Sequence, residues 1–147
     1  MTDIRLAGPA DLEILVPLFD AYRVFYHTPS DPDAARRFLG ARLSAGDSRI
    51  YLAIRNGRAV GFAQLYPSFS SLSMKRLWIL NDLYVDPEAR RSGAGKALMS
   101  AAEAFAREDG AKGLALATQI ENHTAQGLYA KMGYRRDEGF FHYFLTF

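Results

Sequence analysis

The chain has 147 residues, of which 49% are hydrophobic and 23% are charged, and its net charge is only +2. Plentiful apolar residues with a small net charge exclude a disordered chain, and no apolar run reaches the roughly 20 residues of a membrane span. The length leaves too little interior for two domains. Since the first residues also lack the layout of a secretory signal, we expect a cytoplasmic protein with one domain over residues 1–147 and no membrane partner.

Cysteine is absent and there are only three histidines, His27, His123 and His142. Disulfides, thiolate zinc sites and a cysteine nucleophile are therefore excluded, and no local pair of histidines exists to bind a metal. No metal is expected. After residue 50, twelve Lys and Arg stand against nine Asp and Glu. That excess is too small to predict a nucleic-acid partner, although it could serve a small polyanion.

Turn signals and hydrophobic periodicity divide the chain into alternating strands and helices. Pro at a helix start, Gly after a helix end and Asn-Gly between two alternating runs supply most of the boundaries. The expected elements, in chain order, are a strand over residues 2–7, a helix opening at 8–11, a helix near 32–45, hairpin strands over 49–55 and 59–66, a loop over 67–71, a long strand over 77–85, a helix over 93–109, a strand over 114–118, a helix over 122–132, and one or two strands in the aromatic tail over 134–147.

The order of these elements predicts the fold class. The strand–helix–strand unit across residues 77–118 requires parallel strands, whereas the hairpin before it is antiparallel. We therefore expect an α/β (α+β) fold with a mixed central sheet of six to seven strands, flanked by about four helices.

The segment Arg90-Arg91-Ser92-Gly93-Ala94-Gly95-Lys96 lies between the long strand and the next helix. Exposed N–H groups at a helix start suit a phosphate, glycine lets the backbone approach a ligand closely, and the basic side chains add positive charge. A dinucleotide fingerprint would need glycine where Leu98 stands, and a P-loop would need glycine at Arg90 and a hydroxyl residue at Ala97. A loop that only turns the chain is the alternative to a phosphate site.

The remaining match, Arg-x-x-Gly-x-Gly on a strand–loop–helix unit, resembles the pyrophosphate loop of the GCN5-related N-acetyltransferases, the GNAT family. Leu83-Tyr84-Val85-Asp86-Pro87 resembles the family's segment before that loop, and Asn122-x-x-Ala125-x-x-Leu128-Tyr129-x-x-x-Gly133-Tyr134 resembles its second motif. Within the family, the layout is closest to the diamine (spermidine/spermine) acetyltransferases. Those carry an acidic pair where this chain has Asn81-Asp82.

The resemblance implies the GNAT fold and direct transfer of an acetyl group from acetyl-CoA to a primary amine of a small molecule or peptide. It implies that the strand end pairs with the pantetheine amides, that a backbone N–H near Leu83 stabilises the oxyanion, and that the glycine-rich loop holds the pyrophosphate. Asn122 is expected to contact the coenzyme or to cap its helix, or both. The residues expected to bind acetyl-CoA are Leu83, Tyr84, Val85, Arg90, Arg91, Ser92, Gly93, Ala94, Gly95, Lys96, Asn122 and Tyr129.

Two residues are candidates for catalysis. The resemblance places Tyr129 near the coenzyme sulfur, where a phenol with a pKa of about 10 can donate a proton to a departing thiolate. The helical spacing of Tyr129 with its apolar neighbours equally fits a core residue. Asp82 interrupts an apolar strand, where an unpaired carboxylate is costly, so it is expected to act as a base or to hold the amine. A structural ion pair with a nearby Arg is the alternative for Asp82.

The acceptor amine is less well defined. Asn81, Asp82, Tyr26 and His27 are the expected substrate-binding residues, and further aromatic and acidic side chains of the N-terminal half could line the same cleft. The aromatic run over residues 140–147 has more apolar surface than one strand face hides, which predicts a homodimer unless the run is a strand buried within the monomer. A coenzyme-A-binding sensor or regulatory module without turnover is the alternative function.

Overall fold

The computed structural model describes every residue from Met1 to Phe147, and the chain divides into two compact units, Met1–Leu116 and Ala117–Phe147. No helix combines the length and the apolar character that crossing a membrane requires.

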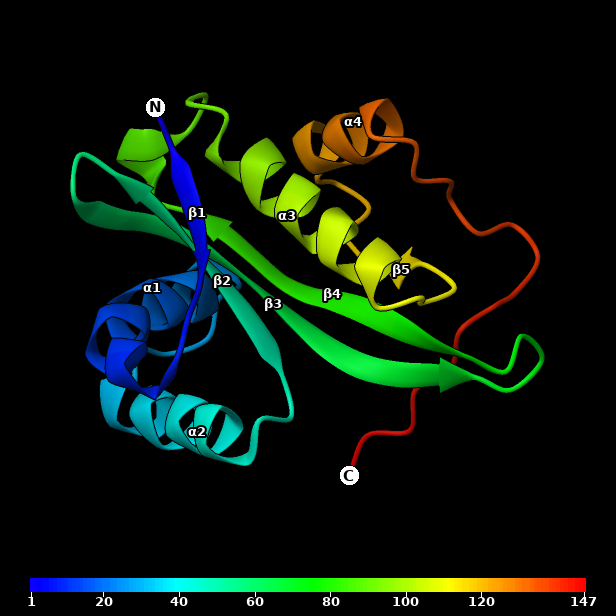
Figure 1. Cartoon of the computed structure of the whole chain (residues 1–147), viewed down its shortest axis with the longest axis horizontal. Coiled ribbons are helices and arrows are strands. Elements are labelled where there is room, and N and C mark those ends of the chain that lie inside the picture. The colour runs from blue at the N-terminus through cyan, green and yellow to red at the C-terminus, as the bar shows by residue number, and fades with distance from the viewer. The chain divides into compact units, whose positions relative to one another are not determined.

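The first unit is built on a five-stranded mixed sheet in the order β1–β2–β3–β4–β5 (Figure 1). Neighbouring strands from β1 to β4 are antiparallel, and β4 and β5 are parallel. The strands are β1 (Asp3–Leu6), β2 (Arg49–Arg55), β3 (Arg58–Ser70), β4 (Lys75–Val85) and β5 (Leu114–Ala115). The mixed sheet is therefore confirmed, but the prediction of six to seven strands is wrong.

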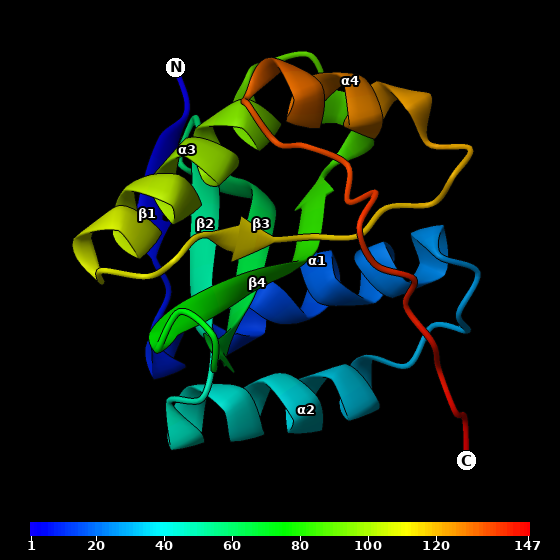
Figure 2. The same ribbon diagram turned by 90° about the vertical axis from the view of Figure 1, so that its right-hand side faces the viewer.

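Four α-helices flank or follow the sheet, as expected. They are α1 (Leu12–Phe25), α2 (Pro32–Ala45), α3 (Ala94–Glu108) and α4 (His123–Lys131), with short 3-10 helices η1 (Pro9–Asp11) and η2 (Pro87–Ala89). In the first unit, α1 and α2 lie on one face of the sheet and α3 lies on the other (Figures 1 and 2).

The core of the first unit fills both faces of the sheet. On the face of α1 and α2, Leu15 and Leu39 pack with Phe62 of β3, and all three are fully buried. On the other side, Leu98 and Met99 of α3 are also fully buried. Burying each such side chain stabilises a fold by about 1.5–3 kcal/mol, so these contacts fix β3 and β4 between the helix layers.

The turns follow from local sequence, with one exception. Asn56 and Gly57 both have positive φ, at 52° and 74°, which is the hairpin turn that Asn-Gly predicts. The loop expected over residues 67–71 is wrong, because β3 runs on to Ser70 and pairs with β4 as far as Lys75. Pro67 is tolerated there because β2 pairs with β3 only as far as Leu65, which leaves the other side of Pro67 at an open edge.

The second unit contains α4 and an extended tail. The Asn122 side chain accepts a hydrogen bond from the Ala125 N–H at 3.2 Å, which confirms its expected role as the helix N-cap. The strands expected over residues 134–147 are absent. A strand needs a hydrogen-bonding partner, and this unit contains no other strand to supply one.

Candidate functional site

Strand β4 has an unpaired edge along its second half. Strand β5 pairs with it only at Trp78 and Ile79, whereas β4 continues to Val85. From Leu80 onward, β4 is paired with β3 on one side only. The backbone N–H and C=O groups on its other side can therefore bind an extended ligand that contains amides, in the manner of an added strand. The predicted pantetheine-binding residues lie on this edge.

A β-bulge interrupts β4 next to this edge. Consecutive residues of β3 pair with Asp82 and Leu80, so Asn81 is the extra residue between them. The Tyr22 hydroxyl of α1 donates a hydrogen bond to the backbone oxygen of Asn81 at 3.4 Å. The bulge therefore joins the middle of β4 to α1 and leaves the Asn81 side chain exposed while Asp82 is buried.

Asp82 is a buried carboxylate held by two neutral amides. Its side chain is only 3% exposed. Gln64 on β3 donates to its Oδ2 at 2.5 Å, and the neighbouring Asn81 donates to its Oδ1 at 2.8 Å. It forms no ion pair, so the alternative of a structural pair with an Arg is wrong. The protein therefore leaves the negative charge of Asp82 without a counterion.

Two tyrosines, Tyr22 and Tyr66, interact with this carboxylate. Burial, with the charge of Asp82 as a second cause, raises the pKa of Tyr22 far above its ordinary value. The same two causes raise the pKa of Tyr66 on β3 to about 12. The ring of Tyr26, a predicted substrate-binding residue, lies 5.1 Å from that of Tyr22. The cluster offers neutral phenols and aromatic faces next to one negative charge.

Two members of this cluster, Gln64 and Tyr66, were not among the predicted site residues. Gln64 did carry a signal, since it is a polar residue inside the apolar run from Val60 to Leu65. What the sequence could not show is that the strand register sets Gln64 opposite Asp82.

The glycine-rich loop is preorganised for an anion. The N–H groups of Ala94, Gly95 and Lys96 at the start of α3 donate to no acceptor within the protein. Gly93 caps the helix with φ 85°, a conformation that glycine adopts without strain. The hydroxyl oxygen of Ser92 is buried and has no hydrogen-bond partner. These unpaired donors fit the phosphates of the expected coenzyme.

The basic residues of the loop differ in how they are placed. Arg90 donates from Nε to the Val85 carbonyl at 3.1 Å and lies over the ring of Phe25, so it braces the loop against β4 and α1. Arg91, with φ 64°, and Lys96 are exposed and form no ion pair. Their charges are therefore available to a polyanionic ligand.

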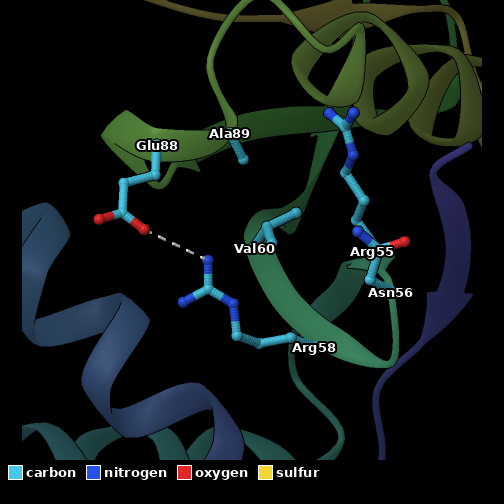
Figure 3. A pocket seen from close by; sticks show the side chains of 6 residues that line it. All are labelled: Arg55, Asn56, Arg58, Val60, Glu88 and Ala89. Carbon is cyan, nitrogen blue, oxygen red and sulfur yellow. Dashed lines mark ion pairs between the residues drawn. The ribbon is translucent and has the colours of Figure 1, made fainter.

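A shallow cavity of about 390 Å³ lies beside the start of this loop (Figure 3). Its lining carries the guanidinium groups of Arg55 and Arg58 and the carboxylate of Glu88. Arg58 lies 3.8 Å from Glu88, whereas Arg55 makes no hydrogen bond or ion pair. The lining is net positive, and no sequence motif pointed to it.

The remaining predicted residues are His27, several acidic side chains and two residues of the second unit. His27 follows α1 with φ 63° and is exposed, and no hydrogen bond joins its ring to the Asp82 cluster. The acidic side chains of the N-terminal half that could line the acceptor cleft have partners close by in the chain. Asp20 accepts a hydrogen bond from Ser30, Asp31 caps α2, and Asp33 forms an ion pair with Arg36. Asn122 and Tyr129 belong to the second unit, where the Tyr129 ring lies 6.0 Å from that of Tyr134. Their approach to the first unit stays a prediction.

Comparison with known proteins decides the family. The model of the acetyltransferase (GNAT) family matches residues 15–134. The chain belongs to the GNAT family. A Bacillus subtilis (strain 168) relative named "Uncharacterized N-acetyltransferase YhfO" is 50% identical over 144 residues, which are 98% of this chain and 97% of the relative. The chain is therefore an acyltransferase of the acetyl-CoA-dependent class, as expected.

Solved structures agree with this assignment. The crystal structure of "a probable acetyltransferase" has a TM-score of 0.94 at 45% identity and covers 99% of this chain and 97% of that one. The structure of AAC(6')-Iy in complex with a bisubstrate analog, CoA-S-monomethyl-acetylneamine, has a TM-score of 0.81 at 25% identity and covers 99% of both chains. The GNAT fold is thus confirmed, whereas the closer likeness to the diamine acetyltransferases is not shown.

Proposed function

We propose that this GNAT enzyme transfers an acetyl group directly from acetyl-CoA to a primary amine of a small molecule or peptide. One observation carries the proposal: a buried carboxylate without a counterion lies on the strand whose free edge leads into a loop of unpaired N–H donors. The carboxylate suits a cationic amine, and the free edge with the loop suits an extended polyanionic coenzyme. A diamine is among the acceptors that such a site fits.

The coenzyme would be held by the free edge of β4 and by the glycine-rich loop that follows this strand. Leu83 and Val85 offer backbone groups on the free edge for the pantetheine amides, whereas the backbone of Tyr84 between them faces β3. The helix N–H groups of residues 94–96, the Ser92 hydroxyl and the charges of Arg91 and Lys96 would hold the pyrophosphate. Asn122 would contact the coenzyme from the start of α4. When bound, the coenzyme supplies the activated acetyl group, which is consistent with a chain that has no cysteine nucleophile.

Three chemical tasks remain for the protein. Asp82 would hold the incoming ammonium and receive its proton, directly or through a water. The backbone N–H near Leu83, on the free edge, would donate to the developing oxyanion. Tyr129 would give a proton to the departing thiolate. Each assignment follows the family's motif positions, and for Asp82 the burial and lack of a counterion add support from this chain.

The assembly is also part of the proposal. We propose that residues 1–147 act as one domain and that two chains associate through the aromatic tail. The tail supports this because Phe141, Tyr143 and Phe144 are each about nine-tenths exposed in the single chain. Light scattering tests the dimer, and a mass of one chain would contradict it.

An acetyl-CoA assay across amine classes tests the function. Free thiol is measured with alkylamines, diamines, amino acids, aminoglycosides and peptides, and acetyl-CoA binding is measured separately by calorimetry. We expect amine-dependent thiol release. Tight binding of acetyl-CoA without release by any amine would instead indicate a sensor that does not turn over.

A further inference from the structure

The two amides that hold Asp82 have a fixed orientation. An ionised carboxylate can only accept hydrogen bonds, so Gln64 and Asn81 must both present their NH₂ groups to it. The carbonyl oxygen of each amide is consequently turned away from the carboxylate. The charge of Asp82 thus decides which atom of each amide is left for another partner.

The two amide oxygens have different surroundings. Gln64 is fully buried, and its Oε1 has no hydrogen-bond partner. A buried acceptor without a partner is costly, so this glutamine is not explained by stability alone. Asn81 is exposed, and no protein group donates a hydrogen bond to its Oδ1. Gln64 therefore acts on Asp82 from within, while Asn81 faces outward.

The surroundings do not neutralise Asp82. The titratable groups that interact with it are the phenols of Tyr22 on α1 and Tyr66 on β3. Both have raised pKa values, so both are neutral at physiological pH. Arg42 and Asp47 act on Tyr66 with opposite sign, and neither pairs with Asp82. A cation that approaches Asn81 therefore meets a negative charge to which hydrogen-bond donors are directed but which no protein cation offsets.

We propose that Gln64, Asp82 and Asn81 form a hydrogen-bonded relay that selects an acceptor arriving as an aliphatic ammonium ion. Asn81 Oδ1 accepts from the ammonium, Asp82 attracts the ammonium by its charge and receives its proton through a water, and Gln64 is the positioning residue that keeps Asp82 directed at Asn81. The inference rests on the proposed function, because it names the acceptor class of the same site.

The neighbouring rings suit the carbon part of such an acceptor. Tyr22, whose hydroxyl bonds the Asn81 backbone, lies in edge contact with Tyr26 at 5.1 Å. Aromatic faces bind alkylammonium groups through dispersion and cation–π attraction. The relay and the rings together favour an amine on a slender alkyl chain over a neutral or acidic acceptor.

A titration followed by NMR tests the relay without turnover. Butylammonium is added to the isotope-labelled protein, with butanol as the neutral control of similar shape, and the side-chain amide signals of Asn81 and Gln64 are followed. We expect butylammonium to shift the Asn81 signal in the native protein but not in Asp82→Asn, and butanol to shift it in neither. Equal shifts by the two compounds, or no shift by butylammonium, would overturn the proposal.

Kinetics of paired variants separate positioning from a structural role. Gln64→Met keeps the side-chain length but removes the NH₂ group, and we expect KM for butylamine to rise about tenfold with little change in kcat. Adding Gln64→Met to Asp82→Asn should raise KM no further, because the carboxylate it positions is gone. Effects that multiply in the double variant would overturn the relay. Ser48→Ala, which removes a different buried polar group without a hydrogen-bond partner, is the control and should leave KM unchanged.

Asn81→Ala covers the case in which Gln64→Met does not fold, since Asn81 is exposed. The native enzyme should prefer butylamine, which is cationic at neutral pH, over trifluoroethylamine, which is not, and Asn81→Ala should lower this preference about tenfold. An unchanged preference would contradict the inference. If no amine releases thiol at all, the proposed function fails, while the NMR titration still decides whether the relay binds ammonium.

Discussion

The conformation of Gly93 makes the glycine-rich loop testable by a matched pair of substitutions. Gly93 precedes α3 with φ 85°, and Gly110 follows α3 with φ 74°. A Cβ added at either position would meet no atom within 4 Å. An alanine at either end therefore causes backbone strain without a clash, at a cost of about 1–2 kcal/mol. For a chain of this size, that corresponds to a fall in Tm of roughly 3–6 °C.

The two substitutions should differ in coenzyme binding. Gly93→Ala strains the loop that carries the unpaired N–H donors, whereas Gly110→Ala strains the far end of the same helix. If relief of strain misaligns one charge-assisted hydrogen bond, the Kd for coenzyme A should rise about tenfold or more in Gly93→Ala alone. Calorimetry measures Kd, and thermal unfolding measures the shared loss of stability. Equal Kd values for the two variants would show that the loop only turns the chain.

Three further predictions concern single residues. Tyr129→Phe should lower kcat sharply while the Kd for acetyl-CoA stays within about twofold, and full turnover would remove the acid role. Gly61→Ala should cost more than about 2 kcal/mol in urea unfolding, because its Cβ would lie 2.7 Å from the Tyr84 carbonyl oxygen and force β3 from β4; a smaller loss would contradict that close approach. The hydrogen-bonded ion pair with Arg5 lowers the pKa of Asp11 in the folded protein. The pair therefore contributes its whole stabilisation above the ordinary pKa of an aspartate, and this contribution is lost as the pH falls through the lowered pKa of the folded protein. The stability difference between the native protein and Asp11→Asn should therefore shrink from about pH 6 to about pH 3, and a constant difference would refute this linkage.

Local chemistry made most of the fold predictable. Pro32 at the first position of α2 and Gly46 in the left-handed conformation after it mark the two ends of that helix, and both signals are visible in the sequence. The Asn56-Gly57 hairpin is another such case. Sequence reasoning worked at these places because the backbone conformation depends on residues that are adjacent in the chain.

The errors lie where structure depends on distant partners. The tail over residues 134–147 is rich in the aromatic residues that strands favour, but composition supplies no partner strand. Pro67 predicts a loop from local sequence alone. It lies in a strand because β2 ends its pairing with β3 at Leu65, so no ladder hydrogen bond is required from Pro67 on that side. In both cases the deciding information is which segment lies alongside, and that information is not local.

The candidate site likewise has a part that the sequence predicts and a part that depends on distant partners. Asp82 was identifiable because a carboxylate in an apolar strand needs an explanation. Its hydrogen bonds to Gln64 and Asn81 depend on the register of β3 against β4 and on the bulge at Asn81, neither of which a single sequence displays. A carboxylate that is hydrogen-bonded by amides keeps its negative charge available to a ligand, whereas an Arg partner would neutralise that charge.

Thiol release from acetyl-CoA in the presence of an aliphatic amine is the most direct test of the central claim. Release should saturate with the amine, and in Asp82→Asn the KM for the amine should rise while acetyl-CoA binding is unchanged. Saturable acetyl-CoA binding with no thiol release across the amine panel, or release that Asp82→Asn leaves unaffected, would contradict the claim.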